Sequence, residues 1–342
     1  VIIDTDPGDD DAASILWVLA SGKFDVKAIT VTNGNVGVDW CAVNALRTLE
    51  VCGCQDIPVY KGAYRPLVRP SIEASWMHGK DGFGDLGFPM PCTKVRSGYA
   101  PVELVRIARE APEPITILVL GPMTNIAMAV LLDSDFENHV KEVIFMGGTF
   151  KVSGNQAPRA SYNVMVDPEA AKVVYNSKIP VVQLGLDVCD MVTQRVEDLE
   201  TIAEAGTRVT DFLTRLLSFR INKAAKPIYD KHGNKVGEIK AENQANRKKG
   251  EIGLNDLTTT GYLINPHWFR TLHTTIDVET QGLCDGETVI DYMGLWGREP
   301  NNYFAYEADG EALVKQWVKD MTAAFRAVSY THLRAHETVL DL

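Results

Sequence analysis

Residues 1–12 of the chain read VIIDTDPGDDDA, with aspartate at positions 4, 6, 9, 10 and 11. An apolar run leads into Asp-Thr-Asp, a Pro-Gly turn and three consecutive acids, and an apolar helical pattern begins at Ile15. The segment therefore predicts a β-strand, a tight turn and a helix, in that order. In an open α/β sheet this junction lies at the carboxyl edge, where such sheets bind their ligands.

The crowding of these acids points to chemistry at the junction. Carboxylates this close repel one another and cannot all ionise without a nearby cation. Capping of the following helix explains one or two of them, but not five. The ligand atoms on offer are all oxygens, which favours a hard cation, Ca²⁺ or Mg²⁺, over zinc. A carboxylate beside such an ion can take a proton from a bound water, so the segment indicates a hydrolase site.

Length, composition and charge limit the classes of protein to be considered. The chain has 342 residues, of which 45% are hydrophobic and 23% charged, and its formal net charge is −11. There is enough apolar material for a full core, and the negative charge disfavours a nucleic-acid partner. No apolar run reaches transmembrane length, so we expect no membrane partner. The six cysteines lack zinc-site spacing, and reduced core thiols favour a cytoplasmic protein.

Strand and helix patterns alternate along the first half of the chain. Further strands are expected at residues 26–31, 57–60, 115–120, 143–146 and 180–186, and helices at 39–51, 102–110, 124–132 and 167–175. This order predicts a doubly wound α/β fold with a mostly parallel central sheet flanked by helices. Residues 61–99 read as a long loop rich in Pro and Gly, and loops of that length are usually functional or mobile.

The second half of the chain has a different character. Helices are expected at residues 196–205, 207–224, 256–264 and 310–328, and strands at 274–278, 288–292 and 303–306. Residues 226–254 are polar and predict a mobile insertion or a hairpin. We expect residues 1–328 to form a single domain that carries this insertion. The last residues, 329–342, fit no pattern and are interpreted as a cloning or assembly tail.

Four further segments carry polar groups at predicted strand ends or in loops: residues 33–35, 120–125, 146–149 and 154–169. Each segment alone is weak, because Gly, Pro and Asn occur in any βα loop. Together they are expected to line the same sheet edge as the acidic segment.

With these motifs the sequence resembles the inosine-uridine preferring nucleoside hydrolases. The resemblance rests on Asp-Thr-Asp-Pro-Gly-x-Asp-Asp at 4–11, Gly-Pro-x-Thr-Asn at 121–125, Met-Gly-Gly at 146–148, asparagines at 155 and 163, Asn-Asp at 255–256, and residues 286–291 and 297–301. It covers about residues 1–328 without the insertion. It implies a doubly wound α/β core and hydrolysis of the N-glycosidic bond of ribonucleosides to free base and ribose, as in purine or pyrimidine salvage.

The resemblance also implies a role for each residue of the site. Ca²⁺ would be held by Asp6, Asp11, Asp256 and the backbone carbonyl of Thr124. Asp6 would also be the general base on the Ca²⁺-bound water. The ribose would be contacted by Asp10, Asn35, Met146, Asn155 and Asn163. Asp4 would support the aspartates beside it.

Two positions depart from the family pattern. Ser161 stands where a glutamate commonly faces the ribose 5′-hydroxyl, and Asn255 stands where a histidine or tryptophan often touches the base or leaving group. Both are kept as candidate substrate contacts. His78 in the long loop is the candidate catalytic residue that helps the base depart, with His232 in the insertion as a second. Trp76 could stack on the base or plug the edge of the fold.

Two alternatives remain open. One is a non-catalytic Ca²⁺-dependent nucleoside or sugar binder. The other is a Mg²⁺-dependent phosphatase of the haloacid dehalogenase type, with Asp4 as nucleophile, although the acids at positions 9–11 are surplus to that chemistry. The complete ligand set with Asp6 favours catalysis. The expected partner is a small-molecule ribonucleoside, and the expected assembly is a homodimer or homotetramer.

Overall fold

The computed structural model describes residues 1–221, 226–229, 235–239 and 250–325. The strands of its main sheet are β1 (Ile2–Thr5), β2 (Ala28–Val31), β3 (Val59–Lys61), β4 (Ile115–Val119), β5 (Val140–Met146), β6 (Val181–Leu184), β11 (Phe269–Val278), β12 (Thr288–Asp291) and β13 (Asn302–Ala308). Among the described residues these nine strands lie in the order β12-β11-β13-β6-β5-β4-β1-β2-β3. Every neighbouring pair from β13 to β3 is parallel, and β11 alone pairs antiparallel with both of its neighbours. The predicted doubly wound, mostly parallel sheet is confirmed.

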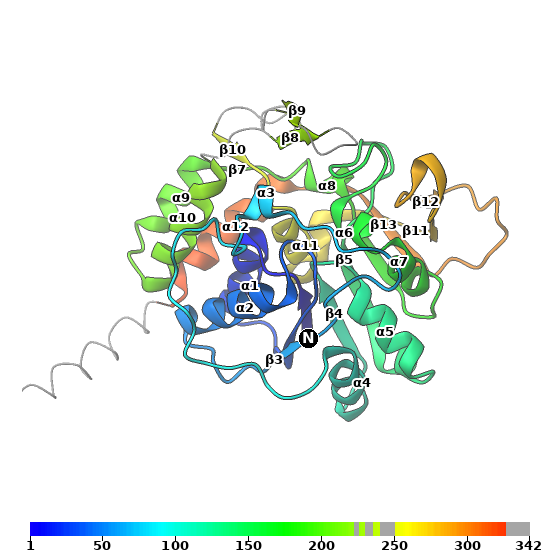
Figure 1. Ribbon diagram of the computed structural model, residues 1–342, viewed down its shortest axis with the longest axis horizontal. Helices are drawn as coiled ribbons and strands as arrows, with labels where there is room; N and C mark the ends of the chain where they lie inside the picture. The colour runs from blue at the N-terminus through cyan, green and yellow to red at the C-terminus, as the bar shows by residue number, and fades with distance from the viewer. Residues whose placement is uncertain (222–225, 230–234, 240–249, 326–342) are drawn as a thin grey trace, which may run out of the picture.

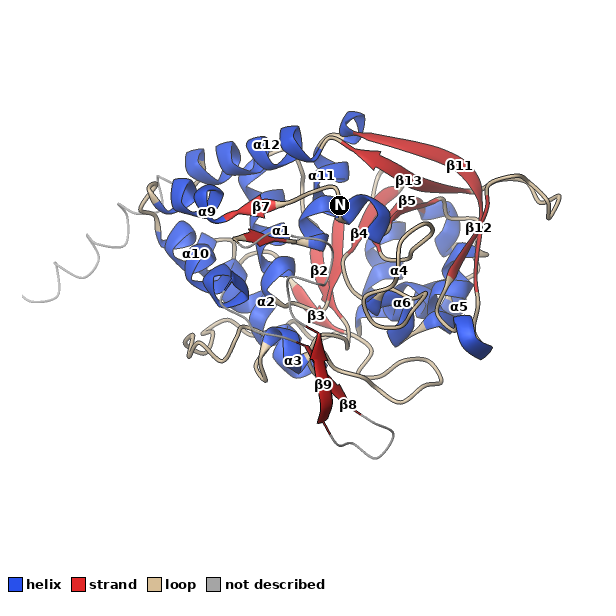
Figure 2. Ribbon diagram, turned by 90° about the horizontal axis from the view of Figure 1, so that it is seen from above, coloured by secondary structure: helices blue, strands red, loops and turns tan. Residues whose placement is uncertain are grey.

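Helices cover both faces of this sheet (Figures 1 and 2). One face carries α1 (Asp9–Ser21), α2 (Val38–Cys52), α9 (Val196–Ala203), α10 (Arg208–Ile221), α11 (Asn255–Ile264) and α12 (Gly310–Ala323). The other carries α4 (Ala100–Glu110), α5 (Thr124–Leu132), α6 (Tyr162–Val166) and α7 (Pro168–Tyr175). Successive side chains of a strand point to opposite faces of the sheet, so Ile3 packs in the first core and Ile2 in the second. Burial on both faces explains why these strands read as continuous apolar runs.

The strand order reverses at β1. The chain proceeds from β1 to β2 and β3 in one direction, and from β4 to β5 and β6 in the other. The connections that leave β1 and β4 therefore turn in opposite directions, and a crevice forms between them at the carboxyl ends of these two strands. The segments that follow β1, β2, β4 and β5 meet at this crevice, which is where the sequence placed its polar groups.

Several predicted boundaries were wrong for identifiable reasons. The predicted loop at 61–99 contains α3 (Ser75–His78), and α8 (Leu186–Cys189), β7 (Gln194–Arg195) and β10 (Glu251–Ile252) were also missed. All four are too short to show a period. Strand β11 begins at Phe269, earlier than predicted, because an antiparallel strand can expose polar residues on one face.

The predicted insertion at 226–254 contains two described strands, β8 (Lys226–Tyr229) and β9 (Lys235–Ile239). They pair antiparallel, as the hairpin alternative required, and β8 lies against α3 (Figure 2). Residues 251–252 instead form β10, and residues 253–254 lead into α11. His232 and the tail at 329–342 lie outside the described residues.

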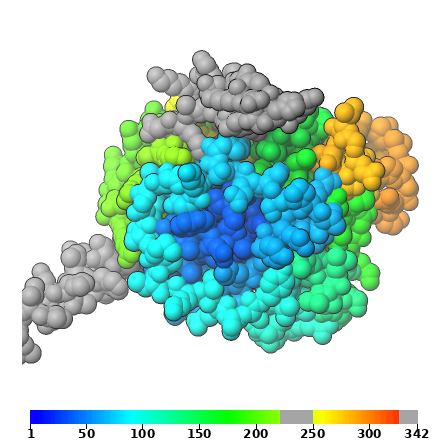
Figure 3. All heavy atoms as spheres, viewed as in Figure 1, coloured from blue at the N-terminus to red at the C-terminus, as the bar shows by residue number. Residues whose placement is uncertain are grey.

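The segment 61–99 runs over the surface of the domain. In the space-filling view residues 1–50, in dark blue, occupy the middle of one face, and the following segment, in light blue and cyan, encircles them (Figure 3). It carries α3 to the carboxyl edge of the sheet, where the backbone N–H of Ala74 donates to the carbonyl of Asn35 at 2.9 Å. Within the described ranges no helix is both long and apolar enough to cross a membrane.

Candidate active site

Asp6 directly follows β1 and is almost wholly buried. The backbone N–H of Asn35 donates to its Oδ2 at 2.7 Å, and the Asn35 side-chain amide donates to the Asp6 carbonyl at 3.1 Å. Asp6 Oδ1 is buried and accepts no hydrogen bond from any described residue. Burial, and then the charge of Asp11, raise the pKa of Asp6 well above its usual range. A buried acceptor of this kind is costly unless a cation or a donor reaches it.

Two glycines make room for the Asp6 carboxylate. A Cβ added at Gly121 would lie 2.5 Å from Asp6 Oδ1, and one added at Gly34 would overlap Oδ2. These glycines follow β4 and β2, the two strands that flank β1 in the sheet. The carboxylate is therefore enclosed by backbone on both sides, and it can keep its position only while both residues lack a side chain.

We expect Gly34→Ala to displace the Asp6 carboxylate and to lower the free energy of unfolding by about 1–3 kcal/mol, as overpacking does. The matched control is Gly37→Ala, whose Cβ would meet Glu73 Oε1 at an ordinary 3.6 Å. That variant should stay within about 1 kcal/mol of the parent. Urea unfolding of the three proteins measures the difference, and equal stabilities of the two variants would contradict the enclosure of Asp6.

Three further carboxylates converge beside Asp6. Oxygen atoms of Asp10, Asp11 and Asp256 lie within 4.8 Å of one another. Asp11 is fixed by Thr5, whose hydroxyl donates to it at 2.5 Å. Burial, and then the charges of Asp11, Asp10 and Asp6, raise the pKa of Asp256 well above its usual range. A donor set of buried, mutually repelling oxygens fits a hard divalent cation, which would relieve the repulsion.

Arg220, near the end of α10, is a site residue that the sequence did not reveal. Its guanidinium contacts both oxygens of Asp10, at 3.1 and 3.3 Å, and forms an ion pair with Asp9 Oδ2 at 2.9 Å. It also donates to the carbonyl of Gly253 at 2.5 Å. Burial raises the pKa of Asp10 to about 6 even though Arg220 opposes the shift. The available signal was the excess of buried acid, which requires a counter-charge, but nothing in the spacing identified position 220.

His78 is the last residue of α3 and is only 5% exposed. Its Nδ1 lies 2.7 Å from Asp9 Oδ1. Burial acts to raise the pKa of Asp9, but the charges of Arg220 and His78 outweigh burial and hold that pKa below its usual range. The loop histidine singled out from the sequence is therefore a buried residue of this site rather than a surface residue.

On the sugar side of the predicted site, side chains are held by backbone groups. The Asn163 side-chain amide donates to the carbonyls of Leu120 and Met146 at 2.5 and 2.9 Å. Asn155 Oδ1 accepts the backbone N–H of Tyr162 at 2.8 Å. These contacts fix the orientation of both asparagines before any ligand arrives.

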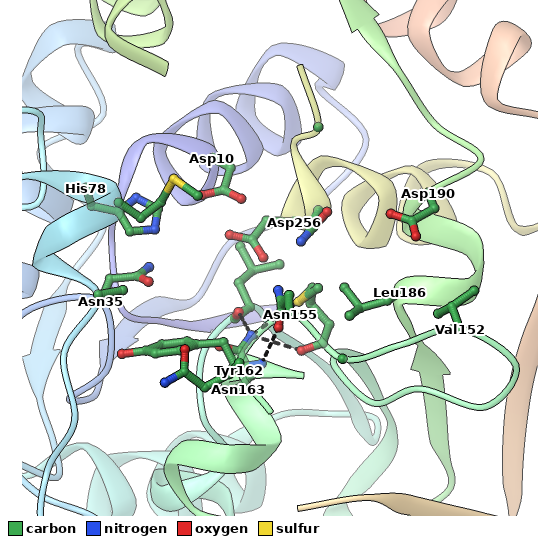
Figure 4. Close-up of a pocket in the computed structure, with 18 of the residues that line it drawn as sticks. Asp10, Asn35, His78, Val152, Asn155, Tyr162, Asn163, Leu186, Asp190 and Asp256 are labelled. Atoms are coloured by element: carbon green, nitrogen blue, oxygen red, sulfur yellow. Dashed lines mark hydrogen bonds between the residues drawn. The ribbon is translucent and has the colours of Figure 1, made fainter. Parts of the chain in front are cut away.

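A cavity of about 620 Å³ opens above these groups, a size suited to a small molecule. Figure 4 shows His78, Asn35 and Asp10 at one end of it, and Leu186, Val152 and Asp190 at the other. The predicted site residues that line it are Asp10, Asn35, His78, Met146, Asn155, Asn163, Asn255 and Asp256, together with Trp76. Asp6 and Asp11 are buried beside this wall, next to Asn35.

Besides Asp6 and Asp11, three further predicted residues do not line the cavity. Ser161 is fully buried, and its hydroxyl accepts the backbone N–H of Gly148 at 2.7 Å. The Thr124 hydroxyl donates to Asp167 at 2.8 Å, although the predicted role of Thr124 concerns its carbonyl. Asp4 is fully buried within β1.

The position of Asp4 decides against the phosphatase alternative. Asp4 lies inside β1 and is fully buried, and its Oδ2 accepts hydrogen bonds from Thr30 of β2 at 2.6 Å and Asn125 of α5 at 2.8 Å. Burial raises the pKa of Asp4 to about 7 against these two hydrogen bonds. A nucleophile must reach its substrate, so Asp4 cannot serve as one here. It instead braces β1 against β2 and α5, beneath the other aspartates.

Comparison with known proteins gives a consistent result. Residues 1–315 match the family model described as inosine-uridine preferring nucleoside hydrolase. The pyrimidine-specific ribonucleoside hydrolase RihA of Citrobacter koseri is 36% identical over 317 residues, covering 92% of this chain and 95% of RihA. RihA of Escherichia coli is 35% identical over the same shares of the two chains.

Solved structures agree with these sequence relatives. The plant nucleoside hydrolase PpNRh1 superposes with a TM-score of 0.84 at 30% identity, over 94% of this chain and 98% of its own. A purine-preferring ribonucleoside hydrolase from Gardnerella vaginalis also reaches 0.84, over 95% and 99% of the two chains. Its 24% identity speaks for the fold alone.

Proposed function

Because this chain belongs to the inosine-uridine preferring nucleoside hydrolase family and hydrolyses ribonucleosides at the N-glycosidic bond, we propose that it does so with Asp6 as general base beside a bound Ca²⁺. One observation carries the proposal. The buried Asp6 Oδ1 lacks a donor among the described residues, and it belongs to the same acidic group as the converging oxygens of Asp10, Asp11 and Asp256.

We assign the ion to Asp6, Asp11, Asp256 and the carbonyl of Thr124. Asp10 is proposed to contact the sugar, but it also lies beside these ligands. Its carboxylate is within 4.8 Å of those of Asp11 and Asp256. When bound, Ca²⁺ would lower the pKa of the attacking water and grip the ribose diol.

The residues of the chain then divide the reaction between them. Asp6 accepts a proton from water as the oxygen attacks C1′. The C1′–N bond breaks with its electron pair going to the base, and His78 supplies the proton that the departing base needs. The sugar gains oxocarbenium character in the transition state. The buried carboxylates stabilise that positive charge more than they stabilise the neutral substrate.

Asp10, Asn35 and Asn163 are proposed to hold the ribose hydroxyls, with Met146 against the ring and Asn155 toward the 5′-hydroxyl. Support comes from their common position on the cavity wall. Ser161 supports this arrangement indirectly, because its bond to Gly148 fixes the turn after β5. Asn255 lies at the start of α11 and is proposed to contact the base.

Pyrimidine ribonucleosides are the proposed substrates, following the printed names of the curated relatives. The test is ribose release, measured as reducing sugar, from uridine, cytidine, inosine and adenosine, with p-nitrophenyl phosphate as the phosphatase control. Ribose from uridine or cytidine is expected, together with no phosphate release. A panel that yields no ribose with Ca²⁺ present would refute the proposal.

The proposed grip on the diol predicts discrimination against 2′-deoxynucleosides. Removing a hydroxyl bound by charged groups leaves those groups unpaired, at a cost of about 1.5–3 kcal/mol. We expect kcat/KM for 2′-deoxyuridine to be roughly 10- to 100-fold below that for uridine. Equal values for the two substrates would show that the 2′-hydroxyl is not held at the acidic group.

A cytoplasmic role in nucleoside salvage is proposed from the reaction itself, because free base and ribose are the materials of that route. The proposed assembly is a homodimer or homotetramer. Light scattering of the purified protein distinguishes these two assemblies from a monomer.

A further inference from the structure

We propose that Asp9 and Arg220 are positioning residues that hold the His78 imidazole toward the departing base. The inference rests on the proposed function, since it concerns how the leaving group is assisted. The sequence did not suggest the contact on which it rests: Asp9 is buried, and its two carboxylate oxygens lie beside His78 and Arg220.

The two oxygens of Asp9 have different partners. Oδ1 lies 2.7 Å from His78 Nδ1, and Oδ2 lies 2.9 Å from Arg220 Nε. A carboxylate facing Nδ1 favours the imidazole form that carries a proton there, and it fixes the plane of the ring. Nε2 is then the ring nitrogen available to a ligand, and it gives a proton to the departing base only from the imidazolium, which carries a proton on both nitrogens and keeps the one on Nδ1. The ring lies on the cavity wall near Asn35 (Figure 4).

Neighbouring backbone and side chains restrict the position of the His78 ring. A Cβ on Gly8 would come within 2.5 Å of His78 Nδ1 and 2.9 Å of Cε1, so the imidazole rests directly on the turn before α1. The α3 backbone is tied in turn to Asn35 through Ala74. Among the described residues Asp9 forms the ion pair with the ring, and a carboxylate oxygen of Asp10 lies within 4.8 Å of a ring nitrogen.

Arg220 is what allows a buried anion at Asp9. Asp9 is only 1% exposed and adjoins Asp10, so without a counter-charge it would be an uncompensated buried charge. The guanidinium reaches Asp9, Asp10 and the Gly253 carbonyl together. Its planar fork of donors suits several partners at once, whereas a lysine ammonium is a single point charge. The arginine thus ties α10 to the start of α1 and to Gly253, two residues before α11.

A double-mutant cycle tests whether Asp9 acts through His78. The variants are Asp9→Asn, His78→Gln and the double variant, each assayed on uridine and on p-nitrophenyl riboside, whose leaving group departs without a proton. Positioned proton transfer contributes roughly 10²–10⁴-fold, so we expect Asp9→Asn to slow uridine hydrolysis about 10- to 100-fold and to spare the nitrophenyl substrate. In the His78→Gln background the same change should have no further effect.

Three outcomes of this cycle would overturn the inference. They are losses that multiply in the double variant, equal losses on the two substrates, and no loss for Asp9→Asn on uridine. A parent enzyme that releases no ribose from any nucleoside would refute the proposed function instead, so the two failures are distinguishable.

Arg220→Lys keeps a positive charge at position 220 but removes the planar guanidinium, so it tests whether the geometry of the arginine matters. If the fork positions Asp9, the lysine variant should lose more activity on uridine than on the nitrophenyl substrate, and any loss that the two substrates share reports on Asp10, which the same guanidinium holds. Parent-like rates on both substrates would show that a positive charge suffices, and that outcome overturns the positioning role of Arg220.

A spectroscopic measurement tests the same inference without relying on activity, which can also fall when a variant is less stable. Nitrogen-15 spectra of histidine-labelled protein report which ring nitrogen carries the proton, and His78→Gln assigns the signal among the seven histidines. We expect the parent to show His78 protonated at Nδ1, and Asp9→Asn to reduce that population. An unchanged His78 signal in folded Asp9→Asn would overturn the inference.

Discussion

Asp6→Asn is expected to lower turnover on uridine by about 10²–10⁴-fold or more, because positioned proton transfer supplies that much and an amide cannot accept the proton of the attacking water. The substitution keeps the shape of the side chain, so its fit between Gly34 and Gly121 is preserved. An amide oxygen can still accept the hydrogen bond from the Asn35 backbone. At saturating Ca²⁺, which offsets the weaker metal binding expected of an amide ligand, the loss should therefore appear mainly in kcat.

The matched control is Asp4→Asn. Asp4 is equally buried and two residues away, but it contacts Thr30 and Asn125 rather than the cavity. This variant should retain kcat within about tenfold of the parent, because a proton acceptor must reach the proton that it takes. Steady-state kinetics on both variants provides the comparison. Turnover of Asp6→Asn within tenfold of the parent would place the general base elsewhere.

Removal of divalent cations is expected to abolish hydrolysis, and Ca²⁺ is expected to restore it. The acidic group has few counter-charges among the described residues, and Arg220 forms an ion pair with only one of its members, Asp10. The chelated protein should also be less stable, because bound Ca²⁺ stabilises the native state by mass action. Metal analysis and thermal unfolding with and without EGTA measure both effects. Full activity after chelation, or zinc as the resident ion, would contradict the calcium assignment.

The metal-free protein should also show a defined pH dependence of stability. Burial raises the pKa of Asp10 to about 6 from its usual value near 3.8, so the folded state binds its proton more tightly than the unfolded state does. The contribution of Asp10 to stability is therefore fully present below about pH 4 and is lost as the pH rises toward 6. Unfolding measured across this range should show the decline without Ca²⁺ and a smaller decline with it.

The sequence predicted those parts of the site that depend on local pattern and sheet topology. Asp6 follows an apolar strand, and Gly34 and Gly121 follow two others, so the parallel arrangement was enough to bring these segments together. The apolar pattern after Asp256 predicted the helix that it opens, but its place in the group came from the family resemblance. None of these inferences needed the path of a loop.

The parts that depend on non-local packing could not be predicted. The pairing of Asp9 with Arg220 requires α10 to lie against the start of α1, and no spacing rule links positions so far apart. The Asp9–His78 contact depends on the route of residues 61–99 over the surface. Ser161 shows the opposite failure: its position next to the sugar side suggested a ligand contact, but its hydroxyl satisfies the Gly148 backbone instead.

The bond between Arg220 and the Gly253 carbonyl has a consequence for how this enzyme could change over evolution or by engineering. It joins the two stems of the segment between α10 and α11 at the rim of the catalytic centre. Loop closure costs little more for a longer segment, about 0.6 kcal/mol for each doubling. We therefore expect the stretch between α10 and α11 to tolerate changes in length, because the Arg220–Gly253 bond holds the end of α10 close to the residues that lead into α11.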